Sequence, residues 1–374
     1  MGIYLDNAAT TAQKPAVVAE AVMEILQGEY GNPSRGAHGY SLAGFRVAEA
    51  ARNKIKDLFK ADQRYEVAFT NNATVALNEV LKGLIHPGDH VITTDWEHNS
   101  VLRPLYQLEA QGVSFDVVTS EAGTGRLNYE QFAEKIRPET KAVICNHASN
   151  VTGNRLELEW VKDFCEKHQL YLIIDASQTA GVVPIDLTDG KIAAVCFTGH
   201  KSLYGPQGTG GVCLLKELPI EPVITGGDGM QSFSKVQPKE LPTLLEAGTL
   251  NIPGLAGLAA GIQWLQEQKK EMKLGDYFYQ ELQKIAGVTI YGDFTNSRVD
   301  VFSINIKDAE SAVVSDLLWE EYQIATRPGY HCAPLMHEAL GTADRGTVRL
   351  SLSSFTTKTE LDQVLAALKN LASR

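Results

Sequence analysis

The chain has 374 residues, enough for two packed domains, and its 44% hydrophobic and 21% charged residues are ordinary for a soluble globular protein. Its formal net charge of −11 disfavours a nucleic-acid-binding or anionic-membrane-binding surface. The first residues lack a signal-peptide pattern, and the longest mostly apolar stretch, residues 252–265, is too short to cross about 30 Å of hydrocarbon. We therefore expect a cytoplasmic protein with no membrane or nucleic-acid partner.

Helical and strand-like patterns alternate through the first 215 residues. Two amphipathic helices are expected first, residues 15–27 opened by a proline and residues 41–60 opened by a serine cap. A strand at residues 66–70 then runs into a helix that begins near Asn72. Six more Val- and Ile-rich runs, separated by helical patterns such as residues 158–169, are expected strands: 90–94, 113–118, 141–146, 170–176, 193–198 and 211–216. This alternation predicts an α/β fold whose wound sheet is covered on both faces.

The pattern changes from residue 252 onward. A long helical stretch leads to strands at residues 288–291 and 301–306, a helix at 310–322, a strand at 347–353 and a final helix at 358–373. A few strands with helices on one face suggest a smaller α+β domain. We expect a large domain at residues 15–255 and a small domain at residues 256–374 that also includes the N-terminal segment 1–14.

The five cysteines do not form a C-x-x-C pair, and their odd number argues against a disulfide framework. Four of them, Cys145, Cys165, Cys196 and Cys213, lie in apolar segments and are expected to be small buried hydrophobic residues. Cys332 differs because its neighbours are polar and turn-forming. It is a candidate nucleophile, and the alternative is an inert loop thiol.

Two expected strand ends carry polar residues that fit one cofactor. Asp175 ends an apolar strand and precedes Gln178, while Lys201 follows the next strand among glycines that allow close backbone approach. Asp175 by itself could cap a helix, and Lys201 by itself could be a surface lysine. Adjacent strands would place both at one sheet edge, where ligands of α/β sheets bind. There a lysine could hold pyridoxal phosphate while the acid keeps the ring nitrogen protonated.

Two further strand ends carry weaker signals. Ala73 and Thr74 open a helix whose backbone amides could bind a phosphate, although the same turn could simply be capped. His98 could stack on a cofactor ring, or it could be an ordinary loop histidine.

Seven motifs then occur in a fixed order along nearly the whole chain, and together they resemble the signatures of cysteine desulfurases and selenocysteine lyases. That family belongs to the class V aminotransferase group of fold-type I. The motifs are LDNAATT (5–11), GNPS (31–34), EHN (97–99), DASQ (175–178), GHKSLYGP (199–206), EAGT (246–249) and RPGYHCA (327–333). The resemblance implies a fold-type I transferase with a mostly parallel seven-stranded sheet in its large domain.

The resemblance also implies the roles of the site residues. Lys201 would hold pyridoxal 5′-phosphate as a Schiff base, Asp175 would contact its ring nitrogen, Gln178 would contact its ring oxygen, and His98 would stack on the ring. The phosphate would lie against Thr74, Thr198 and His200, with Thr249 contributed by the partner subunit of a homodimer. Asn150, Arg349 and Arg327 would surround the substrate carboxylate, for which a guanidinium is suited because it binds both oxygens. Cys332 matches the nucleophile of the R-x-G-H-H-C-A subgroup.

The chain departs from that pattern at three positions. Tyr330 replaces a histidine of the subgroup, Ala73 replaces a common phosphate-binding threonine, and Pro328 stiffens the loop before the cysteine. The implied activity converts L-cysteine to L-alanine and leaves the sulfur on Cys332 as a persulfide, for a possible acceptor protein. His331 or Arg327 would favour the thiolate form of Cys332.

Other functions remain open from the sequence. A selenocysteine lyase acting on L-selenocysteine, a cysteine desulfhydrase or an aminotransferase could use the same cofactor site, and a protein of another class could keep the fold as a non-catalytic sulfur-relay or assembly partner. A metal site at His331, Cys332 and His337 matches no standard zinc spacing, so no metal is expected. No G-x-G-x-x-G follows the first strand, which disfavours a nicotinamide dehydrogenase.

Overall fold

The computed structural model describes residues 2–34, 36–268 and 274–374. A seven-stranded sheet forms its centre, in the order β2-β8-β7-β6-β5-β3-β4. Only β8 runs antiparallel to its neighbours, so the predicted mostly parallel seven-stranded sheet is confirmed. The strands are β2 (Tyr65–Thr70), β3 (His90–Thr94), β4 (Ser114–Val118), β5 (Thr140–Asn146), β6 (Tyr171–Asp175), β7 (Ala194–Thr198) and β8 (Gly210–Leu215).

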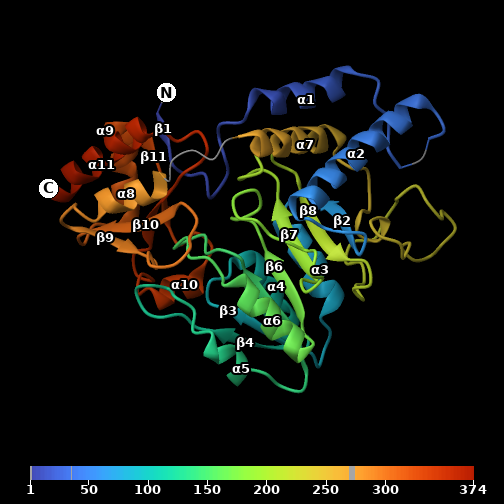
Figure 1. Cartoon of the computed structure of the whole chain (residues 1–374), viewed down its shortest axis with the longest axis horizontal. Helices are drawn as coiled ribbons and strands as arrows, with labels where there is room; N and C mark the ends of the chain where they lie inside the picture. Colours follow the sequence, from blue (N-terminus) through green and yellow to red (C-terminus); the bar gives the residue numbers. More distant parts are fainter. Residues whose placement is uncertain (1, 35, 269–273) are drawn as a thin grey trace.

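Helices cover both faces of this sheet, as the near-continuous apolar strands require. Along β7, Ala194 and Cys196 face a core formed with α3 and α4, whereas Val195 and Phe197 face a core formed with α2, α6 and α7. The layer is visible in Figure 1, where α1 and α7 lie side by side above the sheet. These helices are α1 (Ala16–Gln27), α2 (Gly39–Leu58), α3 (Ala73–Leu84), α4 (Asn99–Glu109), α5 (Glu130–Glu134), α6 (Leu158–His168) and α7 (Ile252–Glu267), with the 3-10 turn η1 (Thr243–Leu245) before α7.

A second, smaller unit contains an antiparallel sheet in the order β12-β13-β10-β9 and a short parallel pair, β1 with β11. Ile3 and Leu5 of the N-terminal segment are buried in its core, together with residues of α8, α9 and α11. The strands are β1 (Ile3–Tyr4), β9 (Val288–Tyr291), β10 (Val301–Ile306), β11 (Ile324–Ala325), β12 (Arg327–Gly329) and β13 (Thr347–Ser351). The helices are α8 (Leu274–Leu282), α9 (Ser311–Tyr322), α10 (Pro334–Ala339) and α11 (Lys358–Ser373).

Helix α7 packs with the large unit. Its Leu255, Leu258 and Ile262 are buried in the same core as α2 and the central sheet. A boundary at residue 255 would cut through this helix. We therefore propose that the small unit begins with α8, and that residues 1–14 join it as expected from the sequence.

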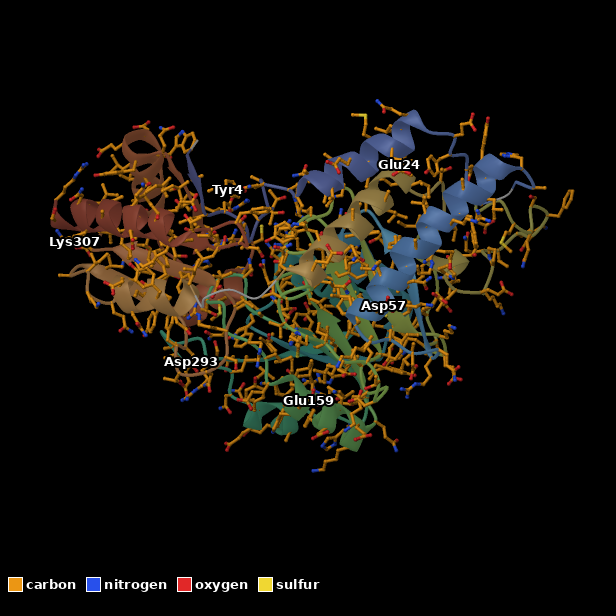
Figure 2. All side chains as sticks on the ribbon, turned by 45° about the horizontal axis from the view of Figure 1, so that its top comes forward. Tyr4, Glu24, Asp57, Glu159, Asp293 and Lys307 are labelled. Carbon is orange, nitrogen blue, oxygen red and sulfur yellow. The ribbon has the colours of Figure 1, made fainter. Side chains whose placement is uncertain are left out.

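The two units meet through hydrogen bonds around the loop after β5. Arg298 Nη2 donates to Thr152 O (2.9 Å), and Ser303 Oγ donates to Val151 O (2.7 Å). Asn154 Oδ1 accepts from the Asp293 backbone N–H (2.8 Å), and Figure 2 shows Asp293 where the small unit approaches the large one. Because most of these acceptors are backbone carbonyls, the contact fixes the position of the β5 loop relative to the small sheet.

One predicted helix start is wrong. Helix α2 begins at Gly39, and its cap is His38, whose Nδ1 accepts from the Ser41 N–H (3.3 Å), so Ser41 lies inside the first turn. In contrast, Asn72 caps α3 through a bond from the Val75 N–H (3.0 Å) to its Oδ1. Within the described ranges, no helix is both long enough and apolar enough to cross a membrane.

Candidate active site

The carboxyl ends of β6 and β7 bring Asp175 and Lys201 into one electrostatic environment. The strands are adjacent and pair Asp175 with Cys196, two residues before the end of β7. Burial lowers the pKa of Lys201 to about 8, the charge of Asp175 opposes that change, and Arg349 and Arg327 add to it. Near pH 8 a substantial fraction of such a lysine carries a neutral amine. The neutral amine is the form that attacks an aldehyde.

Asp175 is 2% exposed and uses one carboxylate oxygen locally. Its Oδ1 accepts from the backbone N–H of Ser177 (2.9 Å) and from the Ser177 hydroxyl. Within the described part of the chain Oδ2 has no hydrogen bond, so it is free to accept from a ligand. Gln178 turns its amide to the N-terminal segment, where Nε2 donates to Ala8 O (3.1 Å).

His98 lies at the start of α4 and caps that helix. The Ser100 N–H donates to His98 Nδ1 (3.0 Å), which fixes the plane of the imidazole. Burial first, and then the charge of Lys201, lower the pKa of His98 to about 4, although Asp175 opposes this. The ring is therefore neutral at pH 7 and can lie flat against an aromatic ligand.

A cavity of about 250 Å³ joins several of the expected residues. Thr74, His98, Arg103 and Cys332 line it, so the start of α3, the start of α4 and the cysteine loop converge there. Lys201 does not line this cavity. Its charge nevertheless acts on His98, which does line it.

The expected phosphate ligands are only partly brought together. Thr74 lines the cavity in the first turn of α3, and Ala73 is buried next to it. Thr198 is buried, and its Oγ1 has no hydrogen-bond partner among the described residues. His200 Nδ1 lies 3.0 Å from Thr10 Oγ1, and burial, Lys201 and Lys14 lower its pKa to about 4, so it is a neutral group. Thr249 lies exposed in the loop before α7 and does not line this cavity.

Arg349 is buried on β13, where it bridges the N-terminal segment and the loop after β5. Its Nη2 donates to Asp6 Oδ1 (3.0 Å), and its Nη1 donates to Asn150 O (3.1 Å). Asn150 in turn donates from Nδ2 to His331 O (2.7 Å). Arg349 Nε and Asn150 Oδ1 are buried without partners in the described structure, so one donor and one acceptor stay available at this point.

Sequence reasoning missed Asp6 as the counter-charge of both arginines. In addition to the bond with Arg349, its Oδ2 lies 3.7 Å from Arg327 Nη1. Arg327 itself is exposed on the short strand β12. Asp6 belongs to the LDNAATT motif, which was a signal that could have identified it.

Cys332 is exposed and lies between β12 and α10. Its φ is +56° and that of His331 is +50°, two successive left-handed conformations that are unusual without glycine. Its carbonyl accepts from the Asn99 N–H (2.7 Å), which ties the cysteine loop to the start of α4 directly after His98. The other four cysteines are fully buried, as predicted.

The expected help from His331 is wrong. This histidine is 7% exposed and its Nε2 lies 3.0 Å from Arg327 O, which turns the ring away from solvent. Burial holds its pKa well below the usual value, so the ring carries no positive charge at neutral pH. Burial lowers the pKa of Arg349, and Cys332 is among the groups, after Asp6, whose charge opposes that change.

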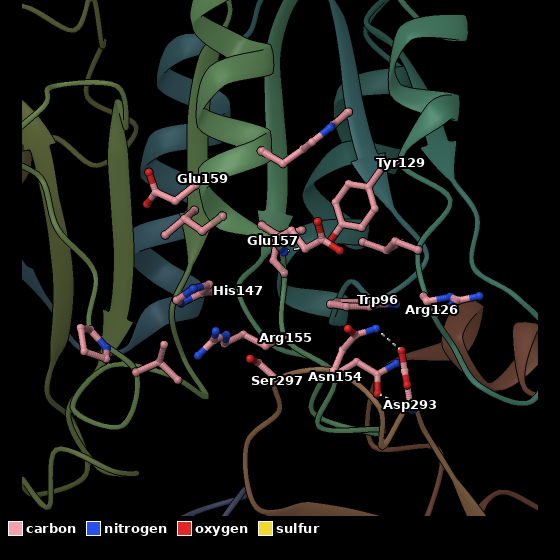
Figure 3. A pocket seen from close by; sticks show the side chains of 17 residues that line it. Trp96, Arg126, Tyr129, His147, Asn154, Arg155, Glu157, Glu159, Asp293 and Ser297 are labelled. Atoms are coloured by element: carbon pink, nitrogen blue, oxygen red, sulfur yellow. Dashed lines mark hydrogen bonds between the residues drawn. The ribbon is translucent and has the colours of Figure 1, made fainter.

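A second and larger cavity, of about 440 Å³, lies elsewhere between the loops after β4 and β5 and the small unit. Figure 3 shows His147 and Arg155 on one side of it and Tyr129 and Trp96 on the other, with Asn154 bonded to Asp293 at its edge. Its charged lining has both signs, so it favours no single class of charged ligand. Among the described residues, no group of three or more His, Cys, Asp or Glu side chains could hold a metal ion.

The family model described as aminotransferase class-V matches residues 3–364. The chain belongs to this family. A probable cysteine desulfurase of Methanothermobacter thermautotrophicus is 30% identical over an alignment covering 99% of this chain and 94% of that protein.

Two solved structures have the same fold as this class-V family member. The apo cysteine desulfurase of Thermococcus onnurineus superposes with a TM-score of 0.90 at 30% identity, covering 100% of this chain and 95% of that one. A cysteine desulfurase of Escherichia coli in an S-sulfonic acid form gives a TM-score of 0.87 at 27% identity, with the same coverage of each chain. The predicted fold-type I architecture is thereby confirmed.

Proposed function

We propose that the protein is a pyridoxal-phosphate-dependent cysteine desulfurase that converts L-cysteine to L-alanine and takes the sulfur on Cys332. The observation that carries this proposal is the convergence of Lys201, Asp175 and His98 with an exposed Cys332 tied to α4. Relatives named as cysteine desulfurases across nearly the full chain support it. A selenocysteine lyase and a cysteine desulfhydrase are the alternatives on the same site, and a non-catalytic sulfur-relay or assembly partner is the alternative from another class.

The residues present fit pyridoxal 5′-phosphate. Asp175 Oδ2 is free to accept from a pyridinium N–H, and the neutral His98 offers a flat face to the ring. Thr198 Oγ1 is a buried hydroxyl that has no partner in the described part of the chain, and a phosphate oxygen would satisfy it. Thr74 and Ala73 begin α3, whose amino end favours an anion.

Substrate binding is assigned to Arg349 and Asn150. Arg349 already shares its charge with Asp6, but Nε is free and the guanidinium is held rigidly by two bonds. A carboxylate placed there receives a charge-assisted hydrogen bond from Nε, and Asn150 Oδ1 remains as an acceptor for the substrate amine. Arg327, exposed beside Asp6, increases the positive potential at the entrance.

When bound, pyridoxal phosphate withdraws electrons from the substrate Cα and so makes its proton removable. Lys201 would carry the cofactor, and its free amine would accept this proton at Nζ. Asp175 keeps the ring nitrogen protonated through Oδ2. The low pKa of His98 means that this ring positions the cofactor without adding a charge.

Sulfur transfer is assigned to Cys332. Its thiolate Sγ attacks the substrate sulfur, a new S–S bond forms, and the substrate C–S bond breaks with its electron pair left on carbon. That β-carbon takes a proton, Lys201 Nζ returns a proton to Cα, and the product leaves as alanine, so the enzyme retains one sulfur atom as a persulfide. Arg349 is a positively charged group whose electrostatic environment includes Cys332.

Product analysis tests the proposal. The purified protein is incubated with a reductant and either L-cysteine or L-selenocysteine, and alanine, pyruvate and sulfide or selenide are quantified for the wild type and for Cys332→Ala. Equal amounts of alanine and sulfide, lost in the variant, are expected. Pyruvate as the main product would indicate a desulfhydrase, turnover of selenocysteine that persists without Cys332 would indicate a lyase, and no turnover of either would favour a relay protein.

We also propose that the protein forms a homodimer. Large apolar side chains are exposed on α1, α2 and the long connection between β8 and α7, which also contains Thr249. Exposed apolar clusters of this kind mark protein interfaces. The residues are Val17, Met23, Leu26, Tyr40, Leu42, Phe45, Val223, Ile224, Met230, Phe233 and Val236.

A further inference from the structure

The strands β3 and β5 separate at their carboxyl ends, next to His98. Their backbone pairing extends to Ile92 and Val143 and goes no further, although both strands continue. Beyond that point side chains connect them. Thr93 Oγ1 donates to Ile144 O (3.0 Å), and the Asn146 N–H donates to Glu97 Oε1 (2.9 Å). Glu97 thus replaces a missing strand contact directly before the residue that is expected to stack on the cofactor.

Glu97 is fully buried and only half satisfied. Oε1 accepts from the Thr94 hydroxyl (2.7 Å) as well as from Asn146, but Oε2 has no partner in the described structure. Asn146 Oδ1 is also buried without a partner, while its Nδ2 faces Trp96 O (3.4 Å). Glu97 and Asn146, which are joined by the bond from the Asn146 backbone N–H, therefore each have a side-chain oxygen that needs a donor.

Among the described residues, the charged groups that act on Glu97 are acidic. Asp175 on β6 and Asp95, directly after β3, both disfavour its negative charge. Burial is the largest effect, and the pKa of Glu97 rises to about 8 despite its two hydrogen bonds. An isolated buried carboxylate is costly, and a buried carboxylic acid avoids that cost.

We propose that Glu97 holds a proton on Oε2 at neutral pH and donates it to Asn146 Oδ1. The single proton satisfies both orphaned oxygens and makes the carboxyl a neutral clasp between β3 and β5. Glu97 is then a positioning residue: it sets the place of His98 and leaves no second negative charge beside Asp175. A flipped Asn146 amide with an ionised Glu97 is the competing arrangement, but it would bring Asn146 Oδ1 against the Trp96 carbonyl.

Infrared spectroscopy of the cofactor-loaded protein tests the proton directly and does not depend on the proposed activity. The wild type is expected to show a protonated-carboxylic-acid band at pH 7 that fades as the pH rises through about 8. The band should be missing in Glu97→Gln and retained in Glu130→Gln, which makes the same change at an exposed site on α5. If Glu97→Gln does not fold, Asn146→Ala must shift the band. No band in the wild type, or one indifferent to these changes, would overturn the proposal.

Stability against pH provides a second readout. A carboxyl whose pKa is about 4.3 when unfolded and about 8 when folded stabilises the fold in acid and loses that stabilisation as the pH rises between these values. Glu97→Gln lacks this loss, so its folding equilibrium constant relative to wild type should grow up to about tenfold per pH unit from pH 5 to 8. A ratio that stays flat over this range, as an ionised Glu97 would give, contradicts the proposal.

The positioning role has its own comparison. Glu97→Ala should change the visible absorbance of the bound cofactor, because His98 loses its support. Glu97→Gln, which keeps the shape and a donor, should restore the wild-type absorbance. Equal changes in both variants would show that a neutral side chain of the same shape does not support His98, and would overturn the proposed positioning role.

Discussion

At the residue scale, the site depends on a few buried charges whose partners lie far away in the sequence. Arg349 is 2% exposed, and it is neutralised by Asp6, which is 343 positions away. Cys332 is accessible, whereas the histidine next to it is buried and neutral. The polar residues expected from the sequence thus lie near the site. Whether each one is charged there depends on how deeply it is buried. Arg349 is a charged group whose environment includes the cysteine, whereas His331 is neutral.

Arg349→Lys tests the substrate-binding assignment. Lysine keeps the charge but cannot bond Asp6, Asn150 and a carboxylate in one plane, so the variant should lose one or two charge-assisted bonds of about 1.5–3 kcal/mol each. We expect kcat/KM for cysteine to fall at least about tenfold, mostly through KM. Arg345→Lys, at a partly exposed arginine that bonds Lys307 O (2.9 Å), is the matched control. An unchanged KM in Arg349→Lys would refute the assignment.

The pH dependence of cofactor loading tests the lowered pKa of Lys201. Because burial lowers its pKa to about 8, the neutral amine becomes available as the pH rises through 8 and not through the usual value near 10.5. The rate at which the cofactor-free protein turns yellow with pyridoxal phosphate should therefore rise from pH 7 to 9 and then level off. A rate that keeps rising to pH 10, or that survives in Lys201→Ala, would be inconsistent with this environment.

At the element scale, the loop that carries Lys201 is held in place by α7. A Cβ on Gly261 would overlap the carbonyl of Leu203, and a Cβ on Gly205 would lie 2.9 Å from Leu258 Cδ1. The glycines of this region therefore serve close packing between the helix and the loop. The packing explains why α7 belongs with the large unit.

Gly261→Ala should push α7 and the lysine loop apart. Overpacking of this kind costs about 1–3 kcal/mol, so denaturant unfolding should show that loss together with weaker cofactor binding. Gly39→Ala provides the control, since nothing lies within 4 Å of a Cβ at that position. Equal effects of the two substitutions would mean that the close approach at Gly261 is unimportant.

At the scale of the whole molecule, the sequence predicted the sheet, its two covered faces and the meeting of Asp175 with Lys201. These follow from local patterns and from the rule that parallel strands end at one edge. Other features depend on tertiary packing that no local pattern reports: the contact of Asp6 with Arg349, the inward turn of His331 and the attachment of α7 to the large unit. The antiparallel β8 had a signal, because the connection from Thr198 to Gly210 contains no crossover helix.

The proposed dimer is a property of the same scale. Sedimentation should give twice the chain mass, and Leu42→Glu on α2 should shift the protein toward monomer because a charge would be buried in the interface. Val313→Glu, at a similarly exposed residue of α9 in the small unit, should leave the mass unchanged. A monomeric wild type, or equal effects of both changes, would contradict the interface.

The persulfide on Cys332 tests the central claim most directly. The cofactor-loaded protein is mixed with one equivalent of L-cysteine without reductant, and the reaction is quenched with an alkylating reagent. The protein is then digested, and the mass of each cysteine-containing peptide is measured by mass spectrometry. We predict that the peptide with Cys332 gains one sulfur atom while the peptides with the four buried cysteines do not, and that Lys201→Ala abolishes the gain. Consumption of cysteine with no added sulfur on Cys332 would contradict the account.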